Sequence, residues 1–230
     1  MIQITFSKEI SDKCPNLHVL AMECSIRNSP SDEQLWQEIE EEAHLICQTV
    51  QLDQINKWSP IRATRQAYKS FGKDPNRYRP SAESLRRRIL RALPLYRVDT
   101  LVDLINLVSI HSGYSIGGFD KNKIQGGKLI LGVGKEGELY HGIGRGILNI
   151  AGLPVYRDEA GGIGTPTSDE ERTKIALETT ELLMIINGYS GLPGLIEAGE
   201  YAADRLRQYA STENINAQLI SSAGTQAISL

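Results

Sequence analysis

The sequence predicts an α+β fold, in which the helices are segregated from a mixed β-sheet. Between residues 33 and 112, hydrophobic residues recur mainly every three or four positions, as they do on helices. After Asp120 the chain changes to short apolar segments separated by glycine turns. Segregated helices and strands are typical of α+β proteins rather than of a doubly wound parallel sheet. Since no linker or internal repeat interrupts the 230 residues, we expect one domain over residues 1–230.

The N-terminal segment predicts two strands and one helix. Met1–Phe6 alternates apolar and polar residues, and His18–Ile26 is more continuously apolar, which indicates a strand that is buried more deeply. Ser29–Asp32 provides a turn and a helix cap. The following helix, Glu33–Val50, has one apolar stripe, and Glu40–Glu42 lie mostly outside it on a solvated acidic face.

Two basic helices follow. Ser59-Pro60 starts the first, because proline is tolerated in a first helical turn, and Gly72 ends it. Ser81 is expected to cap the second helix, which runs to Leu93. Arg86 falls within the apolar arc of this helix, so we expect it to be a buried structural arginine.

Val98–Asp120 contains a helix that is apolar nearly all round, which predicts that it is buried and ends at Gly113. Only Asp103 and Asn106 interrupt it, on the same side, and buried polar groups need partners. On the next strand, Gly117-Gly118 leaves two positions without side chains, where another backbone or a ligand can approach. Helix and strand together predict a pocket wall.

The rest of the chain predicts further strands and one more helix. Gly161–Asp169 is a loop rich in small and hydroxyl residues, and Pro193–Tyr209 is an amphipathic helix. Leu182–Asn187 fits either a strand or a helix, and Asn214–Leu230 is expected to form a terminal strand. The remaining expected strands are Lys128–Val133, Glu138–His141, Leu153–Arg157 and Thr173–Leu177.

Composition narrows the class of protein. Apolar residues make up 40% and charged residues 23% of the chain, and the net charge is −3, which are ordinary values for a globular protein. We find no signal peptide, and the longest strongly apolar run, Leu182–Ile186, is too short to span a bilayer. The three cysteines form neither a disulfide framework nor a metal-ligand spacing. We therefore expect a cytoplasmic protein with no membrane or DNA partner, no metal and no cofactor. The sequence does not indicate its oligomeric state.

The net charge conceals a strong asymmetry. Residues 57–97 contain 12 Lys and Arg but only two acids, which leaves 13 basic and 26 acidic residues in the rest of the chain. Such a cluster on an otherwise acidic protein is typical of a surface that binds RNA phosphates. The alternative is a basic face that pairs with the acidic helix at Glu33–Glu42. The candidate RNA-binding residues are Arg62, Arg65, Lys69, Arg87, Arg88 and Arg91.

The standard catalytic motifs are absent, and one loop remains as a candidate site. The Gly142-x-Gly144-x-Gly146 pattern lacks the spacing of a nucleotide loop and indicates a β-turn, and the four histidines lie near no nucleophile. In contrast, Asp158 precedes the loop GGIGTPTSD, so that carboxylates stand beside backbone amides and hydroxyls. Such groups can stabilise an oxyanion, hold a water or bind an ammonium group. A capped surface loop is the alternative.

A string of motifs in Ser81–Asp120 resembles the B3/B4 domain of the bacterial phenylalanyl-tRNA synthetase β subunit. The shared features are a Ser-started arginine-rich helix, a V-D-x-x-N helix and a later Phe-Asp pair. In this chain they are Ser81 with Arg86–Arg88, Val102-Asp103 with Asn106, and Phe119-Asp120. Further positions that match the family are Ile124, Gly126–Lys128 and Gly161–Gly164. The resemblance covers about residues 58–187, and Arg62–Tyr68 and TPTSDEERT are more similar to free-standing B3/B4 proteins. We expect the strands and acidic helix of residues 1–50 and the helix at 193–209 to pack onto this B3/B4-like domain.

The resemblance implies an editing module that hydrolyses a wrongly formed aminoacyl-tRNA ester. It implies a pocket between the V-D-x-x-N helix, the next strand and the glycine-rich loop, lined by Asn106, Gly117-Gly118 and Gly161-Gly162. Two positions depart from the synthetases. Ile105 stands in place of a threonine and Gly117 in place of a pocket histidine, which leaves the tyrosine specificity of the synthetases open here. The 230 residues also contain none of the synthetases' other modules, so we expect that this chain does not charge tRNA by itself.

The resulting hypothesis is a trans-editing deacylase that acts on aminoacylated tRNA without a protein nucleophile. The expected catalytic residues are Asn106, Thr167, Ser168 and Asp169, and the expected substrate-binding residues are Gly117, Gly118, Asp158, Gly161, Gly162 and Thr165. Asn106 and the hydroxyls would orient water, backbone amides of residues 161–165 would stabilise the oxyanion, and Asp158 or Asp169 would bind the α-ammonium group. Two alternatives stay open: a non-catalytic RNA-binding module, and a protein that binds a free amino acid.

Overall fold

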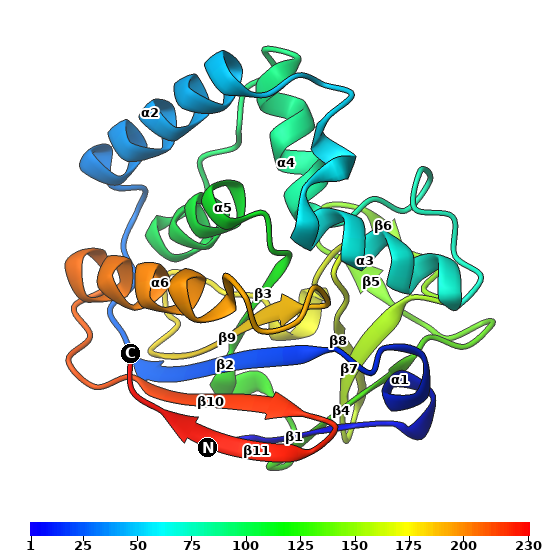
Figure 1. The fold of residues 1–230 in the computed structure, drawn as a ribbon. Helices are drawn as coiled ribbons and strands as arrows, with labels where there is room; N and C mark the ends of the chain where they lie inside the picture. The colour runs from blue at the N-terminus through cyan, green and yellow to red at the C-terminus, as the bar shows by residue number, and fades with distance from the viewer.

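The computed structural model describes residues 1–230 and has an α+β fold, as the sequence predicts (Figure 1). The helices are α1 (Lys8–Lys13), α2 (Glu33–Thr49), α3 (Ser59–Ser70), α4 (Ser81–Leu90), α5 (Thr100–Ser112) and α6 (Leu195–Tyr209). The strands are β1 (Gln3–Phe6), β2 (His18–Ser25), β3 (Ile116–Asp120), β4 (Lys128–Val133), β5 (His141–Gly142), β6 (Gly146–Ile147), β7 (Pro154–Asp158), β8 (Gly161–Gly164), β9 (Glu181–Gly188), β10 (Asn216–Ser221) and β11 (Gly224–Ile228).

The strands form two main sheets and one short hairpin. The larger sheet is antiparallel, with the order β11-β10-β2-β9-β3. The smaller sheet has the order β1-β4-β7-β8 and is mixed, because β1 runs parallel to β4 whereas the other pairs are antiparallel. The hairpin pairs β5 with β6. The mixed sheet expected from the sequence is thus joined by a second, antiparallel sheet.

Strands β2 and β9 lie inside the larger sheet and are buried on both faces. Leu20 and Met22 of β2 belong to a core cluster shared with the helices, whereas Val19 and Ala21 belong to a second cluster shared with the smaller sheet. Successive side chains of a strand point to opposite faces, so a strand between two layers must be apolar at nearly every position. This explains the continuous apolar patterns of both segments, and it is why the ambiguous segment around residues 182–187 is a strand.

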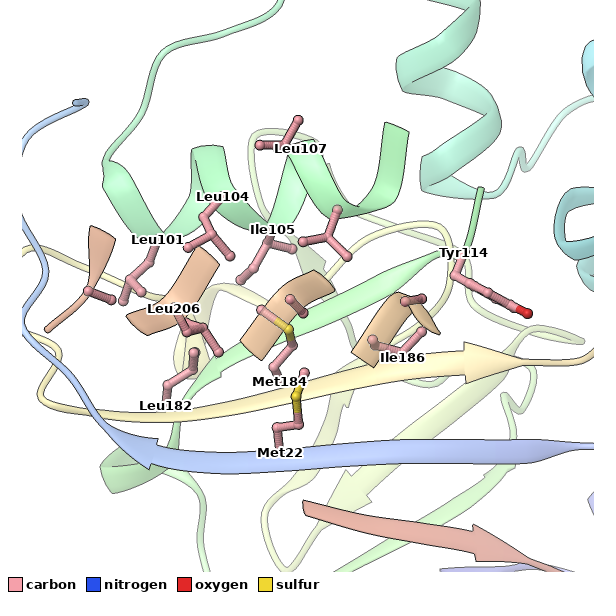
Figure 2. Packing of buried hydrophobic residues seen from close by; sticks show 14 of the residues in the cluster. Met22, Leu101, Leu104, Ile105, Leu107, Tyr114, Leu182, Met184, Ile186 and Leu206 are labelled. Atoms are coloured by element: carbon pink, nitrogen blue, oxygen red, sulfur yellow. The ribbon is translucent and has the colours of Figure 1, made fainter. Parts of the chain in front are cut away.

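Helix α5 lies among α2, α4 and α6 (Figure 1), and Figure 2 shows the side chains that it buries. Leu104 and Ile105 point from it toward the sheet, whereas Leu107 points to the opposite side, where α2 and α4 pack against α5. These neighbours on several sides explain why the helix is apolar nearly all round. The fully buried carboxylate of Asp103 accepts hydrogen bonds from Trp36 Nε1 at 2.6 Å and from the Val98 N–H at 3.1 Å. Asp103 thus ties α5 to α2 and has a structural role.

Some helix ends differ from the predictions. Asp32 caps α2 through the N–H groups of Gln34 and Leu35, as expected. Ser81, however, is the first residue of α4 and does not cap it. Helix α4 ends at Leu90 rather than at Leu93, because Ala92 adopts a left-handed conformation with φ 52°. Helix α1 was not expected, since it is a short helix with only one buried residue.

The strand predictions also need corrections. Of Glu138–His141, only His141 joins a strand, because Glu138 closes a turn in which its N–H donates to the Lys135 carbonyl at 3.3 Å. Thr173–Leu177 is no strand: Thr173 is the last residue of a short 3₁₀ helix, Glu171–Thr173, that the Glu170 side chain caps.

Two further segments form strands or hairpins where the sequence predicted simpler structures. Gly161–Gly164 was expected to be loop but forms strand β8, because its backbone pairs with β7. Its glycines have no side chains, so the sequence shows no strand pattern there. The C-terminal segment forms the β10–β11 hairpin rather than one strand.

Arg86 is a buried structural arginine, as its position in the apolar arc predicts. It is 1% exposed, its guanidinium lies 3.2 Å from the centroid of the Trp58 ring, and it donates to the carbonyl oxygens of Ile110 and His111. These carbonyls belong to the last turn of α5, where no helical partner exists. We expect Arg86→Ala to lower the free energy of unfolding by about 2–4 kcal/mol, measured by urea denaturation, because it leaves buried acceptors and a void. The exposed Arg62→Ala is the control, and an equal effect of both variants would contradict this role.

Candidate functional site

Helices α4 and α5, strand β3 and the turn that follows β8 enclose a cavity of about 370 Å³. This volume is within the range of small-molecule sites in proteins. Its walls combine apolar side chains with a few polar ones. The lining residues are Ser81, Leu85, Val98, Val102, Ile105, Asn106, Ser109, Ile116, Gly118, Ile143, Thr165, Ser168, Asp169, Lys174 and Ile175.

A groove of about 780 Å³ opens into this cavity. The residues that line both are Ser81, Leu85, Val98, Asn106, Ile143 and Ser168. Five arginines line the groove, and no acidic residue does: Arg79, Arg87, Arg88, Arg91 and Arg145. Tyr96 adds an aromatic side chain that is 68% exposed. The groove is therefore a cationic path that leads to a partly apolar cavity.

The turn formed by Thr165–Asp169 is held rigidly at the cavity. The Thr165 hydroxyl accepts hydrogen bonds from the N–H groups of Thr167 and Ser168, each at 3.1 Å. The Tyr140 hydroxyl donates to the Ser168 carbonyl at 2.7 Å, and the Thr167 hydroxyl lies 2.9 Å from that of Tyr68 on α3. Hydroxyl residues close to one another in the sequence commonly fix turns in this way. Here they place the side chains of Ser168 and Asp169 at the cavity wall.

Asp169 brings a carboxyl group into largely apolar surroundings. Its Oδ2 accepts the N–H of Gly118 at 3.2 Å, and its Oδ1 has no hydrogen bond. Burial raises the pKa of the Asp169 carboxyl to about 7, although the Gly118 N–H acts in the opposite direction. A Cβ atom on Gly164 would lie only 2.9 Å from Oδ1, and one on Gly117 would lie 3.5 Å from it. The Phe119 ring lies closer still to both positions, at 2.5 and 2.7 Å, so these two glycines make room for the ring and for the carboxyl group together.

Asn106 supplies a second polar group with free hydrogen-bonding capacity. It is half-buried on α5 and lines both the cavity and the groove. Its side-chain amide makes no hydrogen bond within the protein, in contrast to Asp103 one turn earlier. Partly buried amides normally have partners, so Asn106 is available to a ligand.

The structure brings five of the predicted site residues together. Asn106 comes from α5, Gly118 from β3, and Thr165, Ser168 and Asp169 from the turn. Thr167 lies in the wall of the groove, but its hydroxyl is engaged with Tyr68. The Ser168 hydroxyl donates to the Asp169 carbonyl at 3.3 Å. Of the four expected catalytic residues, Asn106 and Asp169 thus have the freest functional groups.

Four predicted substrate-binding residues do not line the cavity. Gly117 faces away from it, because adjacent residues of β3 point to opposite faces, and a Cβ atom there would meet the Phe119 ring. Gly161 and Gly162 begin β8 at its hairpin with β7 and line neither the cavity nor the groove.

Asp158 is engaged within the protein as well. Its buried carboxylate accepts two hydrogen bonds of 2.9 Å from Arg172 and further ones from the N–H groups of Gln125, Ala160 and Gly161. Burial acts to raise the pKa of Asp158, but these donors hold it below its usual value. Asp158 therefore fixes the β7–β8 hairpin and is not available to a substrate.

Several backbone amides in and beside the segment expected to stabilise an oxyanion are also in use. The Thr165 N–H donates to the Ser168 carbonyl at 3.1 Å, and those of Thr167 and Ser168 donate to the Thr165 hydroxyl. The Gly161 N–H donates to Asp158. These four amides are therefore not available to an oxyanion, and the free side-chain amide of Asn106 is.

The predicted RNA-binding residues separate into three groups. Arg65 and Arg87 both pair with the buried Glu83 at 2.8 Å, although Arg87 also lines the groove. Arg88 and Arg91 line the groove as well. The exposed residues Arg62 and Lys69 lie on α3 outside it. Of the basic segment, only Arg97 pairs with the acidic helix, through Glu33 at 2.6 Å.

Three cationic or aromatic residues of the groove were not predicted. Arg79 belongs to the loop before α4, and Tyr96 to the loop after it. Arg145 lies in the Gly142–Gly146 turn, which is a hairpin turn as predicted, and reaches the groove from a distant part of the sequence. The feature of the sequence that could have indicated a binding role for Arg145 is that it is a cationic residue in an exposed glycine turn.

No three His, Cys, Asp or Glu side chains are arranged so that they could hold a metal ion. None of the helices combines the length and apolar character that a membrane span requires.

Comparisons with known proteins place these features in context. The family model described as the B3/4 domain matches residues 63–210. Among solved structures, an N-terminal fragment of the phenylalanyl-tRNA synthetase beta subunit from Pyrococcus horikoshii is similar, with a TM-score of 0.53 and 14% sequence identity. The match covers 99% of this chain and 54% of the fragment, so the chain spans about half of its length. A search of the curated proteins gave no significant match.

Proposed function

Since this chain belongs to the B3/4 domain family, we propose that it hydrolyses the ester bond of a wrongly charged aminoacyl-tRNA. The observation that carries the proposal is the arginine-lined groove that opens into the cavity with Asn106 and Asp169. An aminoacyl-tRNA has matching parts in the same order: a polyanionic strand, an ester and an amino-acid side chain. A tRNA substrate also agrees with the name of the solved relative, which is part of a tRNA synthetase.

The groove provides the groups that bind a single RNA strand. Arg79, Arg91 and Arg145 are exposed and have no partner within the protein, so they are free to contact phosphates. Arg88 lies 4.4 Å from the centroid of the Tyr96 ring, and the exposed ring can stack on a base. Binding energy from this strand would position the ester at the opening of the cavity.

In the proposed reaction, Asp169 acts as the general base. Its carboxylate takes a proton from a water molecule while the water oxygen attacks the ester carbonyl carbon. The bond between this carbon and the ribose oxygen then breaks, and the ribose oxygen takes up a proton. The products are the free amino acid and the uncharged tRNA. A pKa of about 7 suits a base that must be ionised near neutral pH yet accept a proton.

Asn106 would donate a hydrogen bond from its amide to the developing oxyanion, since the nearby backbone amides are in use. We expect Asn106→Ala to lower kcat for deacylation by about 10²–10³, as for the removal of one oxyanion donor elsewhere. The control is Asn122→Ala, an exposed amide outside the site. If Asn106→Ala deacylated every substrate of a mischarged panel as fast as the wild type, this role for Asn106 would be wrong.

The test of the function is a deacylation screen, in which the protein is incubated with each of a panel of mischarged tRNAs. Turnover of at least one of them above its spontaneous hydrolysis supports the proposal. Salt-dependent tRNA binding without any turnover would indicate the non-catalytic RNA-binding module instead. Binding of a free amino acid without affinity for tRNA would indicate the amino-acid-binding protein.

A further inference from the structure

We infer that the inner part of the cavity selects an aliphatic acyl side chain, so that the esters hydrolysed carry valine-like or isoleucine-like groups. This inference rests on the proposed function and concerns its substrate class. It follows from where the polar and apolar groups of the cavity lie and from which of them are free.

Four aliphatic side chains line the inner part of the cavity. Val102 and Ile105 of α5, Ile116 of β3 and Ile175 line the cavity but not the groove. The residues that line both, where the groove opens into the cavity, are half apolar and half polar, and the polar ones are Ser81, Asn106 and Ser168. An ester whose RNA part lies in the groove would place its carbonyl among these polar groups. Its acyl side chain would then lie against the aliphatic wall.

The polar side chains of the inner part are nearly all engaged within the protein. The Ser109 hydroxyl donates to the Tyr114 carbonyl at 2.8 Å, the Thr165 hydroxyl to the Ser168 carbonyl at 3.0 Å, and Lys174 pairs with Glu171 at 2.6 Å. Asp169 is the exception, and the proposed reaction uses it for water. With Asp169 engaged by the attacking water, a hydroxyl or charged group on the acyl side chain would lose its own water without gaining a partner, which is unfavourable.

Gly118 brings the aliphatic wall close to the strand. A Cβ atom at this position would lie 2.3 Å from Ile105 Cδ1 and 3.0 Å from Ile175 Cδ1. Without it, both isoleucines pack directly against the backbone of β3. The inner cavity is thus closed by branched aliphatic side chains, whose dispersion contacts favour a branched aliphatic group over a polar one.

The test compares valyl and threonyl esters on one and the same tRNA, because the two side chains have nearly the same shape and differ in a methyl and a hydroxyl group. We expect kcat/KM for the valyl ester to exceed that for the threonyl ester by about 10–100-fold, as in other hydrophobic pockets. Val102→Thr introduces a hydroxyl into the wall and should lower this ratio at least fivefold. Val133→Thr, on β4 outside the cavity, should leave the ratio unchanged.

A second variant keeps the test decisive if Val102→Thr does not fold. Ile105→Val removes one methylene from the wall, and we expect it to raise kcat/KM of the isoleucyl ester relative to the valyl ester by about tenfold. Equal or faster hydrolysis of the threonyl ester by the wild type would overturn the inference while leaving the hydrolase function intact. Absence of turnover for every ester would overturn the proposed function itself.

Discussion

Asp169→Asn should lower the rate of ester hydrolysis by about 10²–10⁴ and at the same time make the protein more stable above pH 7. The amide keeps the shape of the side chain but cannot take a proton from water. The loss of rate follows from the missing base. Deacylation of a substrate found in the mischarged panel, measured under single-turnover conditions, gives the first effect, and urea unfolding gives the second.

The gain in stability follows from the pKa of Asp169. Because its folded-state pKa of about 7 lies above the usual value for aspartate, the stability linked to this group is fully present below about pH 4. It is lost as the pH rises through 7, where folding must bury an ionised carboxylate. Asparagine removes this cost, and we expect a gain of about 1–3 kcal/mol in the free energy of unfolding at pH 8. For the same reason, wild-type deacylation should rise with pH and level off above about 7.

Asp158→Asn is the matched control, because both acids flank the same strand. It loses the ion pair with Arg172, so it should destabilise the protein and leave hydrolysis nearly unchanged as long as the protein is folded. If Asp169→Asn retained full activity, or if Asp158→Asn lost as much activity as Asp169→Asn, Asp169 would not be the base.

The second large effect is expected in the groove. Replacing Arg79, Arg91 and Arg145 together by alanine should weaken tRNA binding on the order of 10²-fold at low salt, because three phosphate contacts are lost. The plot of log K against log salt should become shallower by about 2, since each neutralised phosphate of a single strand contributes about 0.7. Filter binding at several salt concentrations measures both quantities.

A triple variant outside the groove controls for the loss of charge. Arg62, Lys69 and Lys128 are exposed cations that do not line the groove, so replacing them by alanine removes the same charge. This variant should keep most of the affinity and nearly the full salt dependence. Equal weakening by both triple variants would show that RNA contacts the whole basic surface and not the groove.

The sequence contains enough information to predict the central helix and the general location of the site. The nearly uniform apolar character of α5 reflects neighbours on several sides, and its polar pair marks one structural position and one position at the cavity. The asymmetric charge of residues 57–97 likewise identifies the arginine-rich helix that forms one wall of the groove. These features depend on local periodicity and composition, which a single sequence reveals.

Other parts of the site depend on contacts between distant residues, and local patterns cannot show them. Asp158 and Asp169 look equivalent beside one glycine-rich loop, yet Arg172 neutralises the first while β3 buries the second. Arg145 completes the groove only because the β5–β6 hairpin lies near α4. Gly117 and Gly118 are neighbours in sequence, but the alternation of a strand places only Gly118 at the cavity.

The most direct test of the central claim, that groove and cavity form one site, compares two esters of the same amino acid. The measurement is kcat/KM of the wild-type protein for an aminoacyl-tRNA relative to the simple ethyl ester. We predict a ratio of at least about 10³, because binding of the RNA strand positions the ester in the cavity, and we predict that the groove variant lowers this ratio. Equal values for the two esters, or no hydrolysis of any aminoacyl-tRNA by the folded protein, would contradict the account.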